Sequence, residues 1–195
     1  MAVLKHRHAL GYLFALCFAY GGMFAFITGS PSVYMGFFNI SETVYPLLFA
    51  ANIVTMILAN RVNVRLLRYY NPSQLLSLGQ SIQLLTGSAL LAYISIVDIP
   101  QIAIVVGLVM LFVGSQSFIV SNATSSTIEF FPNNSGTASA LLGASGFATG
   151  AISGSLVGLL GDGTPLPMAL VMTGCIVMGI TLRFILQRSD KFKAS

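Results

Sequence analysis

The chain has 195 residues, of which 55% are hydrophobic and only 7% are charged, and its formal net charge is +4. Soluble domains carry about 25% charged residues, so this composition excludes a folded chain whose whole surface faces water. The apolar residues occur in long runs and the mean hydropathy is +0.86. These features predict an all-α membrane protein, residues 1–195 forming a single domain of about six transmembrane helices.

The first half of the chain contains three predicted spanning helices, at about residues 10–28, 44–60 and 73–96. Gly29, Ser30 and Pro31 predict an end or a kink in the first of them, because Pro lacks a backbone donor. A basic loop, 61–68, separates the second helix from the third. Ser73 is the predicted N-cap of the third helix.

The second half contains three more predicted spans, at about residues 101–120, 136–160 and 166–186. A tight turn around Asp98 and Pro100 precedes the first of them. A loop at 129–135 and a Gly- and Pro-containing break at 161–165 separate the others. No linker or soluble insertion interrupts this order.

The basic residues indicate the orientation of the predicted helices. Under this threading all nine Lys and Arg fall on one side of the membrane: Lys5, Arg7, Arg61, Arg65, Arg68, Arg183, Arg188, Lys191 and Lys193. The opposite loops carry Glu42, Asp98 and Asp162 and no basic residue. The positive-inside rule therefore predicts a multi-pass membrane protein with both termini in the cytoplasm. It also explains the basic clusters better than nucleic-acid binding does.

Glycines recur every four residues in the fifth predicted helix, at Gly146, Gly150, Gly154 and Gly158. Such a ridge lets a neighbouring helix approach closely in a membrane. Two interpretations remain open, a static packing contact and a sliding surface for a transporter that rocks.

Uncharged polar residues occur within several predicted spans, and amides in lipid are expected to face protein or a wet cavity. The candidates for lining a substrate cavity are Tyr20, Phe24, Asn52, Gln116 and Asn122. The alternative for the amides is hydrogen bonding between helices. No carboxylate falls at mid-membrane, so this chain supplies no obvious proton-coupling group.

A hydrolase is the weakest of the functional alternatives. Gly143-Ala144-Ser145-Gly146 spells a GxSG string, but the nucleophile would need a nearby base. The only histidines, His6 and His8, precede the first helix. We therefore expect no enzymatic activity, and the sequence indicates no metal site or other cofactor.

Several strings resemble the Bcr/CflA drug-resistance subfamily of the major facilitator superfamily. Residues 22–34, followed by Leu48-Phe49-Ala50-Ala51-Asn52, resemble its seventh and eighth helices. Residues 135–143 resemble the start of its eleventh helix, and the loop 61–68 sits where the family has the loop between helices eight and nine. The resemblance covers nearly the whole chain.

This resemblance implies the C-terminal six-helix half of a twelve-helix drug–proton antiporter. It places Tyr20, Phe24, Gln116 and Asn122 on the family's cavity-lining helices, and Asn52 and the glycine ridge on the two helices beside them. It implies efflux of small drug-like molecules across the bacterial inner membrane, with an N-terminal half-transporter, or a second copy, as the partner. The alternative is a non-transporting remnant or a scaffold that binds other membrane helices.

Overall fold

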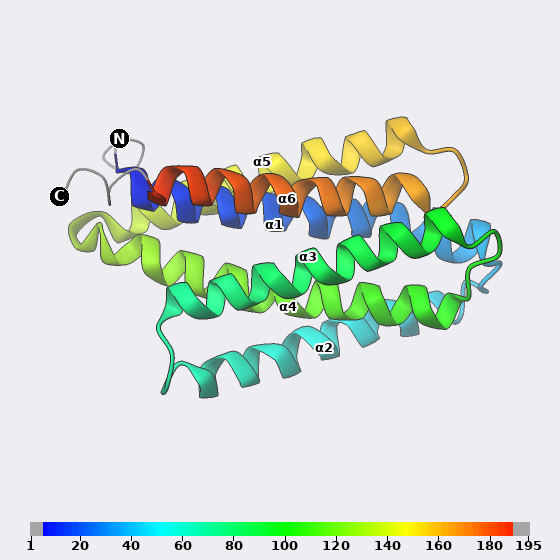
Figure 1. Cartoon of the computed structure of the whole chain (residues 1–195), viewed down its shortest axis with the longest axis horizontal. Helices are drawn as coiled ribbons and strands as arrows, with labels where there is room; N and C mark the ends of the chain where they lie inside the picture. The colour runs from blue at the N-terminus through cyan, green and yellow to red at the C-terminus, as the bar shows by residue number, and fades with distance from the viewer. Residues whose placement is uncertain (1–5, 189–195) are drawn as a thin grey trace.

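The computed structural model describes residues 6–188. Within them six long helices run back and forth in one bundle (Figure 1). The helices are α1 (Arg7–Pro31), α2 (Tyr45–Leu66), α3 (Pro72–Ile96), α4 (Ile102–Glu129), α5 (Ser135–Leu160) and α6 (Leu166–Arg188). All six are long and apolar enough to cross a membrane. The prediction of an all-α membrane protein is confirmed.

Helices α1 and α4 form the centre of the bundle. Helix α1 packs against α4, α5 and α6, while α4 packs against α1, α2 and α3. Helices α2 and α5 lie at opposite edges of the bundle (Figure 1). Of the most apolar stretch of α2 only 11% is buried, against 61% for α4. Helix α2 therefore leaves most of its apolar surface uncovered.

Helix α1 continues past its predicted end at residue 28 into the π-helical segment η2 (Ser32–Phe37). Pro31 has no N–H to give to the carbonyl of Ile27. The hydroxyl of Ser30 donates to that carbonyl instead, at an O···O distance of 3.4 Å, and also lies 2.9 Å from the Tyr45 hydroxyl. The wider π-helical turn that follows lets the helix continue past the proline.

Two other helices extend well beyond the predicted spans. Helix α2 includes Arg61 and Arg65, which were expected in a loop, and α4 runs past Val120 to Glu129. Hydropathy locates the part of a helix that lies in lipid, whereas backbone hydrogen bonding decides where the helix ends. Polar residues such as Thr127, whose hydroxyl donates to the Ala123 carbonyl, sit in the helix without breaking it.

The N-terminus of α3 differs from its prediction, and one arginine of α6 makes contacts that the sequence did not predict. Asn71, not Ser73, is the N-cap of α3, and its N–H donates to the Oε1 of Gln74 at 3.1 Å. Arg183 was expected at the cytoplasmic end of the sixth predicted span, and it lies within α6, where it is only 8% exposed. Its guanidinium reaches Ser73 of α3, a contact between distant residues that sequence spacing does not reveal.

Candidate functional site

A cavity of about 390 Å³ opens between α1, α2 and α4. Its volume is in the range of small-molecule sites, about 300–1,000 Å³. The lining residues are Tyr20, Met23, Ile53, Met56, Ile57, Asn60, Gln116, Ser117, Val120 and Ser121. None of these residues is charged, so the cavity offers apolar contact and a few neutral hydrogen-bonding groups.

Gln116 is the most constrained polar residue of this cavity. Its side chain is buried, and its Oε1 accepts a hydrogen bond from the Nε2 of Gln83 on α3 at 3.0 Å. Gln83, itself fully buried, also donates to the backbone oxygen of Phe112. The Nε2 of Gln116 has no hydrogen-bond partner within residues 6–188. The amide is therefore held in one orientation with a free donor beside the cavity.

Tyr20 and Phe24 both lie on α1, but only Tyr20 lines the cavity. The Tyr20 ring lies 5.5 Å from the Phe147 ring of α5, centroid to centroid, and the Phe24 ring lies 5.8 Å from it. Phe147 is 58% exposed. Together the three rings form an aromatic cluster between α1 and α5 that extends to the surface.

The other two cavity candidates, Asn52 and Asn122, are buried away from the cavity lining. The Nδ2 of Asn122 donates to the Oδ1 of Asn63 on α2 at 2.8 Å and to the backbone oxygen of Phe118 at 2.7 Å. The Nδ2 of Asn52 donates to the backbone oxygen of Leu48 at 2.9 Å. Asn122 thus links α4 to α2 by a hydrogen bond. Hydrogen bonding between helices was the alternative to cavity lining for these amides.

The glycine ridge of α5 faces α1 along three of its four positions. A Cβ added at Gly146, Gly150 or Gly154 would lie 3.0 Å from Leu16, 2.7 Å from Phe24 and 2.7 Å from Thr28, respectively. A Cβ at Gly158 would meet no atom within 4 Å. The close contact between α1 and α5 therefore ends at Gly154, and Gly158 is not part of it.

Sequence reasoning missed several lining residues of the cavity. Asn60, Ser117 and Ser121 supply most of its remaining polar groups. The sequence contained a signal, since Ser117 and Ser121 are four residues apart and share a helix face next to Gln116. The partner of Asn122, Asn63, had no signal, because it was assigned to a loop.

Ser145 of the hydrolase-like string lies within α5. The Ser145 backbone oxygen accepts a hydrogen bond from the Thr149 hydroxyl, as in ordinary helix packing. His6 caps α1, its Nδ1 accepting from the Ala9 N–H at 3.3 Å, and its ring lies 4.3 Å from the Phe130 ring. His6 thus has a structural role at the start of α1.

No family model matches the chain. It is, however, 36% identical over 182 residues to a bicyclomycin resistance protein homolog of Haemophilus influenzae. The aligned residues cover 93% of this chain and 45% of the relative. The resemblance to the Bcr/CflA drug-resistance transporters is confirmed. The chain is also 26% identical over 178 residues to an uncharacterised transporter of the major facilitator type from Bacillus subtilis, covering 91% of this chain and 44% of that protein.

The chain spans about half the length of the curated relatives it matches. Facilitator-type transporters bind substrate between two bundles of helices near the middle of the membrane. The similarity supports a role in membrane transport, and an open cavity on one face of six helices agrees with that role.

Proposed function

We propose that this chain is the C-terminal half of a drug-efflux transporter and supplies one wall of its substrate cavity. The observation that carries the proposal is the open cavity between α1, α2 and α4, which Gln116 lines. The Nε2 of this buried amide is a hydrogen-bond donor that has no acceptor among the described residues. The second wall would come from an N-terminal half-transporter, or from a second copy of the chain. The substrate would be a small, mainly apolar molecule with a hydrogen-bond acceptor.

The exposed apolar edges of the bundle can meet either lipid or the apolar face of a partner. Helix α2 exposes large apolar side chains along its length, and so does α5 at the opposite edge (Figure 1). The side chains concerned are Leu47, Ile53, Val54, Ile57, Leu58 and Val62 of α2, and Phe147, Ile152, Leu156 and Leu159 of α5. Ile53 and Ile57 of α2 also line the open cavity, so in this proposal the second half of a rocking transporter would meet the bundle at that edge.

We propose that the transporter exchanges substrate for protons and so uses the proton gradient as its energy source. The proton-binding group would lie on the partner. No described span of this chain carries a carboxylate at mid-membrane, and proton relays within membranes need such groups. In this proposal the protein lies in the bacterial inner membrane with both termini in the cytoplasm, as the basic residues predict.

A transport assay tests the proposal. We expect cells that express the chain together with an N-terminal half to export bicyclomycin only while the proton gradient is intact. Gln116→Leu should lower the export rate by about tenfold, because a lost hydrogen bond costs about 1–1.5 kcal/mol. Gln101→Leu is the matched control, since Gln101 is exposed and lies outside the cavity.

The alternative function is a non-transporting remnant or a helix-binding scaffold. If export were absent both with an N-terminal half and with a second copy of the chain as partner, the transporter proposal would be rejected. A stable complex with other membrane helices, without transport, would then favour the scaffold.

A further inference from the structure

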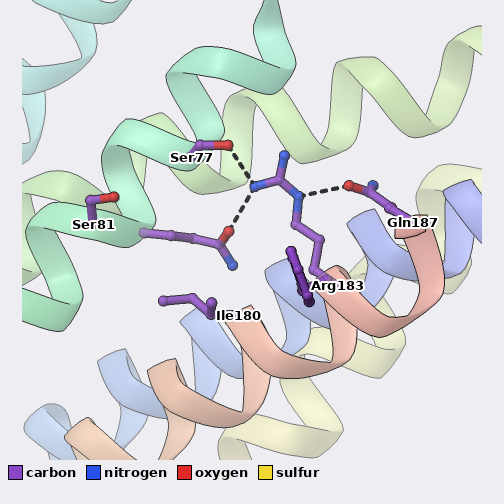
Figure 2. Close-up of a pocket in the computed structure, with 7 residues that line it drawn as sticks. Ser77, Ser81, Ile180, Arg183 and Gln187 are labelled. Carbon is purple, nitrogen blue, oxygen red and sulfur yellow. Dashed lines mark hydrogen bonds between the residues drawn. The ribbon is translucent and has the colours of Figure 1, made fainter. Parts of the chain in front are cut away.

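A second cavity, of about 640 Å³, lies between α3 and α6. It shares no lining residue with the cavity of the proposed transport site. Ser77, Ser81, Ile180, Arg183 and Gln187 surround it in Figure 2. Ser77, Ser81 and Phe184 are exposed, so this cavity opens on the outer face of the bundle.

Arg183 is the charged group of this cavity. The guanidinium makes five hydrogen bonds, all to uncharged acceptors: Gln187 Oε1 (3.1 Å), Ser77 Oγ (3.0 Å), Gln80 Oε1 (2.8 Å), Ser73 O (3.2 Å) and Ser73 Oγ (3.0 Å). The Tyr12 ring covers it at 5.7 Å from Cζ to the centroid. These contacts hold the guanidinium in one position beside the cavity.

The positive charge of Arg183 is not compensated by any carboxylate among residues 6–188. Neutral dipoles orient a guanidinium, but no residue of the described range 6–188 gives this cation, at only 8% exposure, a counter-charge. Burying an unpaired charge is costly, and charged residues within membrane spans usually mark a binding or transport site. An anion in the adjoining cavity would supply the missing charge.

Gln80 adds a second, independent feature. Its side chain is 3% exposed and lines the cavity, and its Nε2 has no hydrogen-bond partner in the described chain. Because its Oε1 accepts from Arg183, the amide cannot turn without losing that bond. The free group beside the cavity is therefore a donor, which suits an anionic ligand.

The rest of the cavity suits a hydrocarbon chain. Ile180 and Phe184 line it, and the neighbouring outer surface exposes Leu78, Val177 and Ile185. The guanidinium reaches Ser73 in the first turn of α3, so the charged end of the cavity lies at one end of the bundle. Lipid headgroups meet a spanning bundle at this level, with their acyl chains pointing toward its middle.

We propose that this cavity binds an anionic glycerophospholipid. Arg183 attracts the phosphate, Gln80 and the Ser81 hydroxyl donate to its oxygens, and one acyl chain lies along Ile180 and Phe184. The described lining has no carboxylate that would hold the ammonium of a zwitterionic headgroup. Basic pockets between transmembrane helices bind anionic headgroups in this way.

Native mass spectrometry of the full chain in mild detergent tests the proposal with three probes: phosphatidylglycerol, phosphatidylethanolamine and inorganic phosphate. We expect phosphatidylglycerol to bind most tightly. Arg183→Gln should weaken its binding about fivefold or more, because a basic residue at the membrane surface contributes about 1 kcal/mol to anionic lipid binding. Arg65→Gln removes the same charge from an exposed position at the same end of the bundle and should have little effect.

A second variant covers the case in which Arg183→Gln does not fold. Ser81→Trp leaves Arg183 and its five hydrogen bonds in place and fills the exposed mouth of the cavity. It should abolish phosphatidylglycerol binding while the thermal unfolding of the protein stays unchanged. Undiminished binding in Ser81→Trp would overturn the proposal. Equal binding of phosphatidylglycerol and phosphatidylethanolamine would overturn it too, as would inorganic phosphate binding as tightly as the lipid.

Discussion

Buried amides connect the helices of this protein at the scale of single residues. Gln83 and Gln116 join α3 to α4, and Asn63 and Asn122 join α2 to α4. Hydrogen bonds between helices are favoured in lipid because an unpaired amide is costly there. In both pairs one amide N–H₂ remains without a partner in the described chain, on Gln116 and on Asn63. Only the Gln116 amide belongs to a residue that lines the proposed transport cavity.

A double-mutant cycle measures the Gln83–Gln116 contact. We expect Gln83→Leu and Gln116→Leu to be coupled by about 0.6 kcal/mol, and at most about 1.7 kcal/mol, as in other interhelical hydrogen bonds within membranes. The measurement is the free energy of unfolding in mixed micelles.

The control cycle combines Gln83→Leu with Asn122→Leu, two residues that share no hydrogen bond. These changes should be additive within about 0.5 kcal/mol. If the first cycle were equally additive, the Gln83–Gln116 bond would contribute nothing measurable to stability.

The contact between α1 and α5 shows how small residues set the distance between two helices. Gly150 and Gly154 let α5 approach Phe24 and Thr28 more closely than any larger residue would. The same helix carries Gly158 one turn further on, at an exposed position with open space around it. The sequence spacing is identical, but each four-residue step turns about 40° beyond a full helical turn. By Gly158 the ridge has left the packed face, on which the neighbouring Val157 is buried.

This difference provides a matched pair of variants. Gly154→Leu should lower the unfolding free energy by about 1–3 kcal/mol, because overpacking forces the helices apart. Gly158→Leu should leave stability within about 0.5 kcal/mol of the parent, as exposed substitutions do. Thermal unfolding in mild detergent compares the two, and equal effects would show that the ridge does not pack on α1 in the membrane.

At the scale of the whole molecule, six antiparallel spans bring alternate loops to the same end of the bundle. The end of α2 and the end of α6 lie at the same end of the bundle, opposite the turn between α3 and α4 (Figure 1). Arg65 and Asp98 are both exposed, at these opposite ends.

Cysteine labelling tests which end faces the cytoplasm. With a membrane-impermeant maleimide, we expect Asp98→Cys to react in intact spheroplasts and Arg65→Cys to react only in inverted vesicles. The native cysteines, Cys17 and Cys175, are buried and should give a low background. Labelling of both positions from the same side would contradict the six-span threading.

The sequence by itself determined that hydrocarbon is the solvent for this chain, because 7% charged residues cannot cover a water-facing surface. Long apolar runs fixed the number and order of the spans, since each must satisfy its backbone hydrogen bonds within one helix. The strings around Pro31 and Asn52 identified the relatives. Helix ends were less well predicted, as Arg65 shows, because hydropathy reports the lipid boundary and not the last hydrogen-bonded turn.

Only the tertiary structure decided which residues of neighbouring helices meet. It separated Gln116, which lines a cavity, from Asn122, which bonds to Asn63, although both are amides on the same helix. It also showed that Arg183, which was expected at the basic end of the last span, is buried and donates to Ser73. The physical reason is that helix rotation and crossing are set by packing over the whole bundle, which no local pattern of residues contains.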